Sequence, residues 1–335
     1  MDDERRQSLK TKELFDNKLS QLPDIVVSYS KTLYNLSINT QYDRIRVIDR
    51  LLEKSKKDIK DLTYDDFFNF LSDTSIGRCA QRTKYFNLKP FCTYLYKNKI
   101  ISENYMEDIP LPKMVETKET IEKRNNGYLT IDEMKLVMNE INKDDTALGV
   151  RDQALFSFML NSGIRESALL NINIQDYDRV KRCITVTEKE ELVREYCLSL
   201  EVCKLIDKWL YIRNMISSIY TDQLFLHLSL EDIDPDMIIC GPYLIYNKRA
   251  YTYREFTKGD LYKTVLNRTS CVEGKHITPH KLRATYGTQI YEKTKDLYFT
   301  QKCMGHRSPQ TTEKYIRSNV NPTIEASNIM TNLLT

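Results

Sequence analysis

The chain is 335 residues long, about twice the length of one typical domain, so two domains are expected. Glycine and proline together make up only about 5% of it, which argues against a turn-rich sandwich or barrel and favours a mostly helical protein. The hydrophobic fraction of 41% is too high for a disordered chain. The formal net charge of +3 is close to zero and identifies no partner by itself.

The first ten residues, MDDERRQSLK, are polar and lack the apolar core of a signal peptide. No later apolar run approaches the ~18 residues that span a bilayer, so we expect a cytoplasmic protein without a membrane segment. The 8 cysteines include no C-x-x-C pair and there are 4 histidines, which disfavours a zinc site or a disulfide framework. No nucleotide-binding glycine motif occurs, so we expect no cofactor and no metal.

The N-terminal part predicts a four-helix unit over residues 21–106, preceded by an extension at 1–20. Apolar residues recur at helical spacing over 22–36, 39–55 and 63–73, and a fourth helix is expected over 78–99. Thr63 is the candidate N-cap of the third helix. The segment 107–127 contains two prolines and then a charged run without apolar periodicity, so it is expected to be a linker.

The stretch 74–102 carries six basic residues and no acidic one, with five aromatic residues interleaved. A helix of this composition can bury its aromatic rings in the bundle and present its cations to a phosphate backbone. The alternative, a solvated basic face, stays open. The candidate DNA contacts are Arg78, Arg82, Lys84 and Lys89.

Residues 128–320 are expected to form the second domain. It begins with a capping signature, Thr130 followed by Glu133, at the start of a helix over 130–143. A further helical stretch, 150–171, is broken at Ser162-Gly163. The segments 183–187 and 194–200 are typical of a β-hairpin.

The remainder of this domain predicts one more strand pair and four helices. The strands are expected at 224–228 and 243–252, separated by a loop insertion at 229–242, and the helices at 258–267, 279–294, 296–304 and 308–317. Residues 321–335 form a partly apolar tail that is expected to be a short helix.

Four short motifs carry the residues with chemical potential. They are NSGIRESALLNI with Arg165 after a glycine, the hairpin turn with Lys189, TPHKLRATYGT with His280 and Arg283, and CMGHRSPQTTEKYIR with His306 and Tyr315. His280 and Arg283 are three residues apart and share one helical face. Each residue alone also fits a structural role, such as a surface salt bridge or a core side chain.

In this order and at these spacings, the motifs resemble the catalytic set of the tyrosine recombinases, the family that includes phage and transposon integrases. The resemblance covers residues 20–320. It implies a mainly α protein, in which a helical core-binding (SAM-like) domain precedes a mostly helical catalytic domain with a small β-hairpin. It also implies a site-specific DNA recombinase that cleaves and rejoins DNA through a 3′-phosphotyrosyl intermediate, as part of integration, excision or inversion.

The resemblance assigns roles to six residues. Arg165 and Arg283 clamp the phosphate, His280 and His306 hydrogen-bond to it, Tyr315 is the nucleophile, and Lys189 protonates the leaving 5′-hydroxyl. Two planar guanidinium groups suit the negative charge that develops on the phosphate oxygens. This electrostatic stabilisation requires no metal ion.

One position departs from the family pattern. The family usually carries an acidic residue three positions after the first arginine, where it braces the site, and here that residue is Ala168. Glu166 lies roughly 100° away around the helix and cannot simply substitute. We therefore expect the brace to be absent or supplied from elsewhere.

The expected partner is double-stranded DNA with specific recombination sites, bound by a homo-tetramer that is a monomer or weak dimer when free; the sequence leaves accessory factors open. Only about 20 residues precede the first expected helix, which leaves no room for an arm-binding domain. Two alternatives are a type IB topoisomerase, with the same chemistry, and a non-enzymatic DNA-binding relic of the fold.

Overall fold

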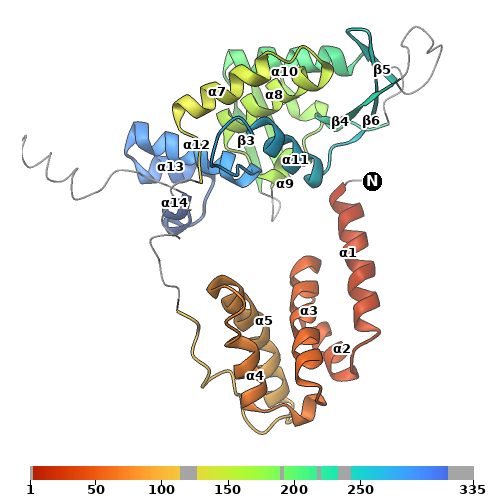
Figure 1. The fold of residues 1–335 in the computed structure, drawn as a ribbon, viewed down its shortest axis with the longest axis vertical. Helices are drawn as coiled ribbons and strands as arrows, with labels where there is room; N and C mark the ends of the chain where they lie inside the picture. The colour runs from red at the N-terminus through yellow and green to blue at the C-terminus, as the bar shows by residue number, and fades with distance from the viewer. Residues whose placement is uncertain (1–2, 114–126, 189–191, 217–219, 233–242, 316–335) are drawn as a thin grey trace, which may run out of the picture. The chain divides into compact units, whose positions relative to one another are not determined.

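The computed structural model describes residues 3–113, 127–188, 192–216, 220–232 and 243–315. The chain divides into two compact units, residues 1–116 and 117–335, each with its own hydrophobic core (Figure 1). None of the described helices combines the length and the apolar character needed to cross a membrane.

The first unit is a bundle of helices with no strand among its described residues (Figure 1). Its α-helices are α1 (Asp3–Leu19), α2 (Asp24–Ser30), α3 (Ile38–Ser55), α4 (Tyr64–Leu71) and α5 (Arg78–Lys97), with short 3-10 turns at Lys31–Leu33 and Ile59–Asp61. The N-cap predicted at Thr63 is confirmed, because Thr63 and Asp66 form a capping box at the start of α4. The four helices predicted from the sequence are thus present, with shifted ends.

The sequence predicts that the first helix begins after residue 20, and this is wrong, because α1 occupies most of the N-terminal extension at 1–20. Phe15 of α1 is buried in the core of the first unit. Lys18 pairs with Asp49 of α3 at 2.5 Å, and this hydrogen bond raises the pKa of Lys18. One buried aromatic side chain and one ion pair therefore attach an otherwise polar helix to the bundle.

The expected linker also begins too early. Met106 and Ile109 are buried in the core of the first unit, and the Tyr85 hydroxyl donates to the Met106 carbonyl at 3.3 Å. Arg82 Nη1 donates to the Pro112 carbonyl at 2.8 Å. Residues 107–113 therefore pack on the bundle, while 114–126 lie outside the described residues.

The second unit combines helices with two small antiparallel sheets (Figure 1). Its α-helices are α7 (Ile131–Asn142), α8 (Ala147–Ser162), α9 (Glu166–Leu170), α10 (Leu200–Arg213), α11 (Lys258–Arg268), α12 (Pro279–Thr294), α13 (Leu297–Met304) and α14 (Pro309–Tyr315), with a 3-10 turn at Ile174–Asp176. The α8 helix is central, since it packs against α7, α10 and α12. The predicted capping box of Thr130 and Glu133 begins α7.

The predicted hairpin is confirmed as β2 (Cys183–Thr187) and β3 (Val193–Cys197), joined by the short β1 (Tyr177–Asp178) in the order β1-β2-β3. Ile184 lies opposite Tyr196, and Val186 lies opposite Arg194. Because side chains alternate between the faces of a strand, these four residues share one face.

The second sheet has the order β4-β6-β5, with β4 (Leu226–Glu231), β5 (Tyr243–Tyr246) and β6 (Arg249–Glu255). The single strand expected at 243–252 is thus two strands. Asn247 and Lys248 both have positive φ, 49° and 57°, as a two-residue hairpin turn requires. The loop expected at 229–242 starts later, since β4 continues to Glu231, and residues 233–242 lie outside the described part.

The α10 helix was not predicted. Its side chains Val202, Ile206, Trp209 and Ile212 are buried at helical spacing, so the pattern was present in the sequence. The Trp209 indole is fully buried and donates from Nε1 to the Leu224 carbonyl at 2.8 Å.

Candidate active site

The break after α8 places Arg165. Gly163 ends the helix with a φ of 57°, in the left-handed region, and Arg165 is the N-cap residue of the short α9. An added Cβ at Gly163 would overlap the ring of Tyr286 on α12. Both the backbone conformation and the lack of space therefore require glycine two residues before the arginine.

Arg283 lies at the centre of the site, on α12, with 4% of its surface exposed. Its Nη1 donates to the Gly163 carbonyl, and its Nη2 donates to the Met304 carbonyl at the end of α13. One guanidinium group therefore joins the ends of α8 and α13 to α12.

Arg165 approaches the same place from the other side. Its Nη1 forms an ion pair with Glu188, and its Nη2 donates to the Gly305 carbonyl at 2.8 Å. About a third of the Arg165 side chain is exposed, 32%, against 4% for the Glu188 side chain. The arginine is thus held from behind and keeps an accessible side.

His306 completes the buried cluster. Arg283 Nη2 lies 3.1 Å from its Nε2, and since a guanidinium can only donate, Nε2 is the acceptor and Nδ1 carries the proton. Nδ1 lies 3.0 Å from Thr312 Oγ1 and donates a hydrogen bond to it. Burial, reinforced by the charges of Arg283 and Arg165, lowers the pKa of His306 to about 4. The imidazole is therefore neutral at pH 7.

His280 is on the first turn of α12, after Thr278, whose side chain caps this helix. It is exposed, and its charge contributes to lowering the pKa of His306, so the two histidines lie near each other. The helix between His280 and Arg283 is regular, so the two residues share one face as predicted.

Two predicted catalytic residues are not placed. Lys189 lies outside the described residues, directly after Glu188 at the end of β2. Tyr315 is the last residue of α14, and its side chain also lies outside the described part. Their roles stay predictions. Arg283 contacts His306 directly, and Arg165 and Arg283 donate to the adjacent carbonyls of Gly305 and Met304.

The sequence interpretation missed three residues of the hairpin. Glu188 continues the inward alternation of Ile184 and Val186, and Arg194 and Tyr196 lie on the same face. Arg194 Nη2 donates to the Cys303 carbonyl, and its guanidinium occupies the space where a Cβ on Gly305 would lie. The two-residue period of β2 was the signal, because it turns a charged side chain inward at 188.

The four candidate DNA contacts of α5 differ in their surroundings. Arg78 and Lys89 are exposed, whereas Arg82 and Lys84 are half-buried. Lys84 Nζ lies 4.1 Å from the ring centroid of Phe70 and donates to the Phe70 carbonyl at 3.3 Å. Burial lowers the pKa of Lys84. Arg82 and Lys84 thus have structural partners within the first unit.

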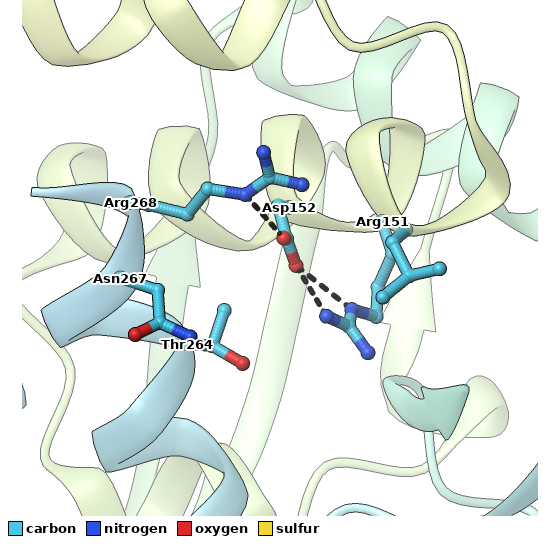
Figure 2. A pocket seen from close by; sticks show the side chains of 6 residues that line it. Arg151, Asp152, Thr264, Asn267 and Arg268 are labelled. Atoms are coloured by element: carbon cyan, nitrogen blue, oxygen red, sulfur yellow. Dashed lines mark hydrogen bonds and ion pairs between the residues drawn. The ribbon is translucent and has the colours of Figure 1, made fainter. Parts of the chain in front are cut away.

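Figure 2 shows a separate pocket between α8 and α11. Asp152 accepts from Arg151 Nε and from Arg268 Nε, both at 2.8 Å, and Arg268 also pairs with Asp144 at 2.5 Å. An α-helix rises ~1.5 Å per residue, which puts roughly 18 Å between Arg151 and Gly163. The charges of this pocket neutralise one another and join α8 to α11, apart from the arginine cluster.

The arrangement of Arg165 and Arg283 suits an oxyanion. Both are permanently charged, and their fixed N–H groups match phosphate geometry. The residue three positions after Arg165 is Ala168, which is buried in the core, and Glu166 pairs with Lys258 at 3.6 Å. The expectation that Glu166 does not take the place of the family's acidic residue is therefore confirmed.

Comparisons with known proteins identify related sequences. The model of a family described as "Phage integrase family" matches residues 127–321. Tyrosine recombinase XerC of Caldanaerobacter subterraneus subsp. tengcongensis is 30% identical over 263 residues, which cover 77% of this chain and 65% of that protein. The match thus spans slightly less than two thirds of that relative. Tyrosine recombinase XerC of Staphylococcus aureus (strain JH9) is 26% identical over 282 residues, which cover 83% of this chain and 85% of that protein.

A solved structure shares the fold. The post-cleavage complex of the XerH site-specific recombinase with a palindromic difH substrate has a TM-score of 0.67 at 20% identity. The similarity covers 96% of this chain and 89% of that one. The mainly α fold expected from the sequence, with its small β-hairpin, is thereby confirmed.

Proposed function

The chain belongs to the phage integrase family of tyrosine recombinases, and from this premise we propose that it is a site-specific DNA recombinase. It cleaves and rejoins DNA strands through a 3′-phosphotyrosyl intermediate. The observation that supports this function best is the convergence of Arg165 and Arg283 on the carbonyls that end α8 and α13, with His306 hydrogen-bonded to Arg283. Three segments far apart in sequence build one cationic site.

In the cleavage step, the Tyr315 hydroxyl loses its proton to solvent, its oxygen attacks the scissile phosphorus, and the phosphotyrosyl bond forms as the bond to the 5′-oxygen breaks. Lys189 gives its proton to that leaving oxygen. Arg165 and Arg283 stabilise the charge on the non-bridging oxygens, and His280 lies beside them on α12. Resealing runs the same steps in reverse, because the phosphotyrosyl bond conserves the energy of the phosphodiester.

The partner in this proposal is double-stranded DNA with specific sites. Two proteins of the same fold support this partner: XerH is described as bound to a palindromic difH substrate, and the Tn1549 transposon integrase as in complex with a circular intermediate DNA. We expect the first unit to contact the phosphate backbone through α5, and four copies to assemble on two sites. The reaction belongs in the cytoplasm, where the DNA of the cell is accessible to it.

The test is covalent trapping on nicked suicide DNA that carries the cognate site. The wild-type chain is expected to form a protein–DNA adduct, and Tyr315→Phe is expected to abolish it while binding persists. Tyr211→Phe is the matched control, since Tyr211 is 68% exposed on α10. An undiminished adduct in Tyr315→Phe would disprove the nucleophile.

The alternatives give other outcomes in the same assay. A type IB topoisomerase would relax supercoiled plasmids that lack any cognate site. A DNA-binding relic would bind the site and form no adduct with any variant.

A further inference from the structure

We infer that Glu188 is a positioning residue for Arg165, and that it ties the β2–β3 hairpin to the phosphate-binding arginines. This inference rests on the proposed function. It assigns the missing acidic partner of Arg165 to a different element, the end of β2, instead of its own helix.

The first observation is the placement of Glu188 by the strand. Ile184 and Val186 point inward on β2, and Glu188, directly after the strand, continues this alternation and is buried. The Glu188 amide donates to the Leu192 carbonyl at 2.8 Å, which continues the ladder of the hairpin. The backbone of Glu188 is therefore fixed by the sheet.

The second observation is that both carboxylate oxygens have partners. Oε2 pairs with Arg165 Nη1, and Oε1 accepts from the Tyr196 hydroxyl at 2.6 Å. Tyr196 is itself buried, with its ring edge-on to Phe158 of α8 at a centroid distance of 6.4 Å. A buried carboxylate held by two donors keeps one orientation.

The third observation is the direction of the ion pair. The Glu188 carboxylate is almost fully covered, while Arg165 has an accessible side, so the acid lies behind the arginine as seen from solvent. A phosphate arriving from solvent meets the exposed part of Arg165, while the Glu188 carboxylate stays covered. This geometry favours positioning over competition with the phosphate.

The fourth observation is the absence of any acid on the same face of α9. Ala168 is packed in the core, and Glu166 is engaged by Lys258. With Gly305 as its other partner, Arg165 is held by two fixed points, one on β2 and one after α13. Without Glu188, one of the two points that set the guanidinium plane is lost.

Arg194 provides a second contact between the hairpin and the rest of the site. Its guanidinium lies 4.8 Å from the Tyr196 ring centroid and donates to carbonyls at the end of α13. The contacts of Glu188 and Arg194 therefore attach the hairpin to Arg165 and to the end of α13.

The experiment compares Glu188→Gln with the wild type in single-turnover cleavage of cognate DNA. The amide keeps the size of the side chain and removes the charge, so we expect cleavage to slow by about 10- to 100-fold, the scale of a misplaced transition-state partner. DNA affinity and the thermal midpoint are expected to stay unchanged. Glu195→Gln is the matched control, an exposed glutamate on β3.

A double-mutant cycle separates positioning from a structural role. If Glu188 acts through Arg165, the variant Arg165→Ala/Glu188→Gln is no slower than Arg165→Ala alone. Additive losses would overturn the inference. A Glu188→Gln variant that cleaves as fast as the wild type would overturn it as well. Faster cleavage would also overturn it, because it would show that Glu188 competes with the phosphate for Arg165.

A third experiment distinguishes an effect of Glu188 through Arg165 from an effect on protonation of the leaving group. A 5′-bridging phosphorothiolate leaves without protonation, so it bypasses the general acid. The Glu188→Gln defect is expected to persist on this substrate, and full rescue would show that Glu188 acts through Lys189 instead. If the wild-type chain forms no adduct at all, the proposed function fails, and that result is distinct from each of these.

Discussion

The ring of Tyr286 lies against Gly163 on the side where every other residue would place its Cβ. The contact joins the middle of α12 to the end of α8, two residues before Arg165. The conformation at Gly163 therefore determines both the direction of the chain after α8 and the position of Arg165.

Gly163→Ala is therefore expected to destabilise the second unit. A left-handed conformation costs a non-glycine residue roughly 1–2 kcal/mol, and overlap with a packed ring adds ~1–3 kcal/mol. The free energy of unfolding, measured by urea denaturation, should fall by about 2–5 kcal/mol. Gly259→Ala is the control, since only Thr257 Oγ1 at 3.8 Å lies near its added Cβ and helix α11 tolerates alanine. Equal midpoints for the two variants would contradict this account.

His306 is expected to make stability depend on pH. Its pKa is about 4 in the folded protein, against an ordinary value of 6.5. Between these values only the unfolded chain binds the proton, so acidification through this window favours unfolding, and above pH 6.5 the full contribution is present. Denaturation at pH 7 and pH 5 should show a smaller loss for His306→Gln than for the wild type.

A residual loss is expected in that variant, because burial also lowers the pKa of His227. His276→Gln serves as the control, since the His276 ring is exposed before α12 and forms a hydrogen bond with the Tyr262 hydroxyl. Identical pH dependence of the wild type and His306→Gln would refute the buried neutral imidazole.

Lys189→Ala is expected to cleave normal DNA poorly and to be substantially rescued by a 5′-bridging phosphorothiolate. The rescue follows because a thiolate leaving group needs no proton. Single-turnover cleavage of both substrates measures it, with Lys181→Ala, an exposed lysine before β2, as the control. A variant equally slow on both substrates would point to another acid.

The cations of α5 are expected to fall into two classes. Lys89→Ala should reduce the salt dependence of DNA binding by about one phosphate contact, a slope change of ~0.9, without altering stability. Lys84→Ala should instead lower the stability of the first unit, because Lys84 packs on Phe70. Titrations over a range of salt concentrations and denaturation curves distinguish the two. An unchanged slope for Lys89→Ala, matching an exposed control such as Lys60→Ala, would indicate a solvated lysine.

The sequence was sufficient where the signal is local. Thr130 and Glu133 cap their helix within one turn, and Gly163 ends α8 by its own conformational freedom. The spacing of His280 and Arg283 likewise needed only a regular helix. These features depend on residues a few positions apart, so they could be read without knowledge of the tertiary structure.

Features that depend on partners distant in the sequence could not be predicted from it. The alternation along β2 indicates that Glu188 faces inward, but nothing local identifies its partner, Arg165, which lies 23 residues earlier. The α1 helix is mostly polar, and what holds it is the burial of Phe15 and the pair of Lys18 with Asp49, contacts that appear only after folding. Ion pairs between residues far apart in the sequence leave no periodic pattern from which they could be predicted.

Trp209 gives the second unit an optical signal of its own. It is the only tryptophan in the chain, and its indole is fully buried on α10, hydrogen-bonded to the carbonyl of Leu224. Indole emission shifts to longer wavelength when water reaches the ring, so tryptophan fluorescence follows the unfolding of residues around α8 and α10 alone. Circular dichroism follows the helices of both units. Where the two curves separate, the unit without a tryptophan unfolds independently.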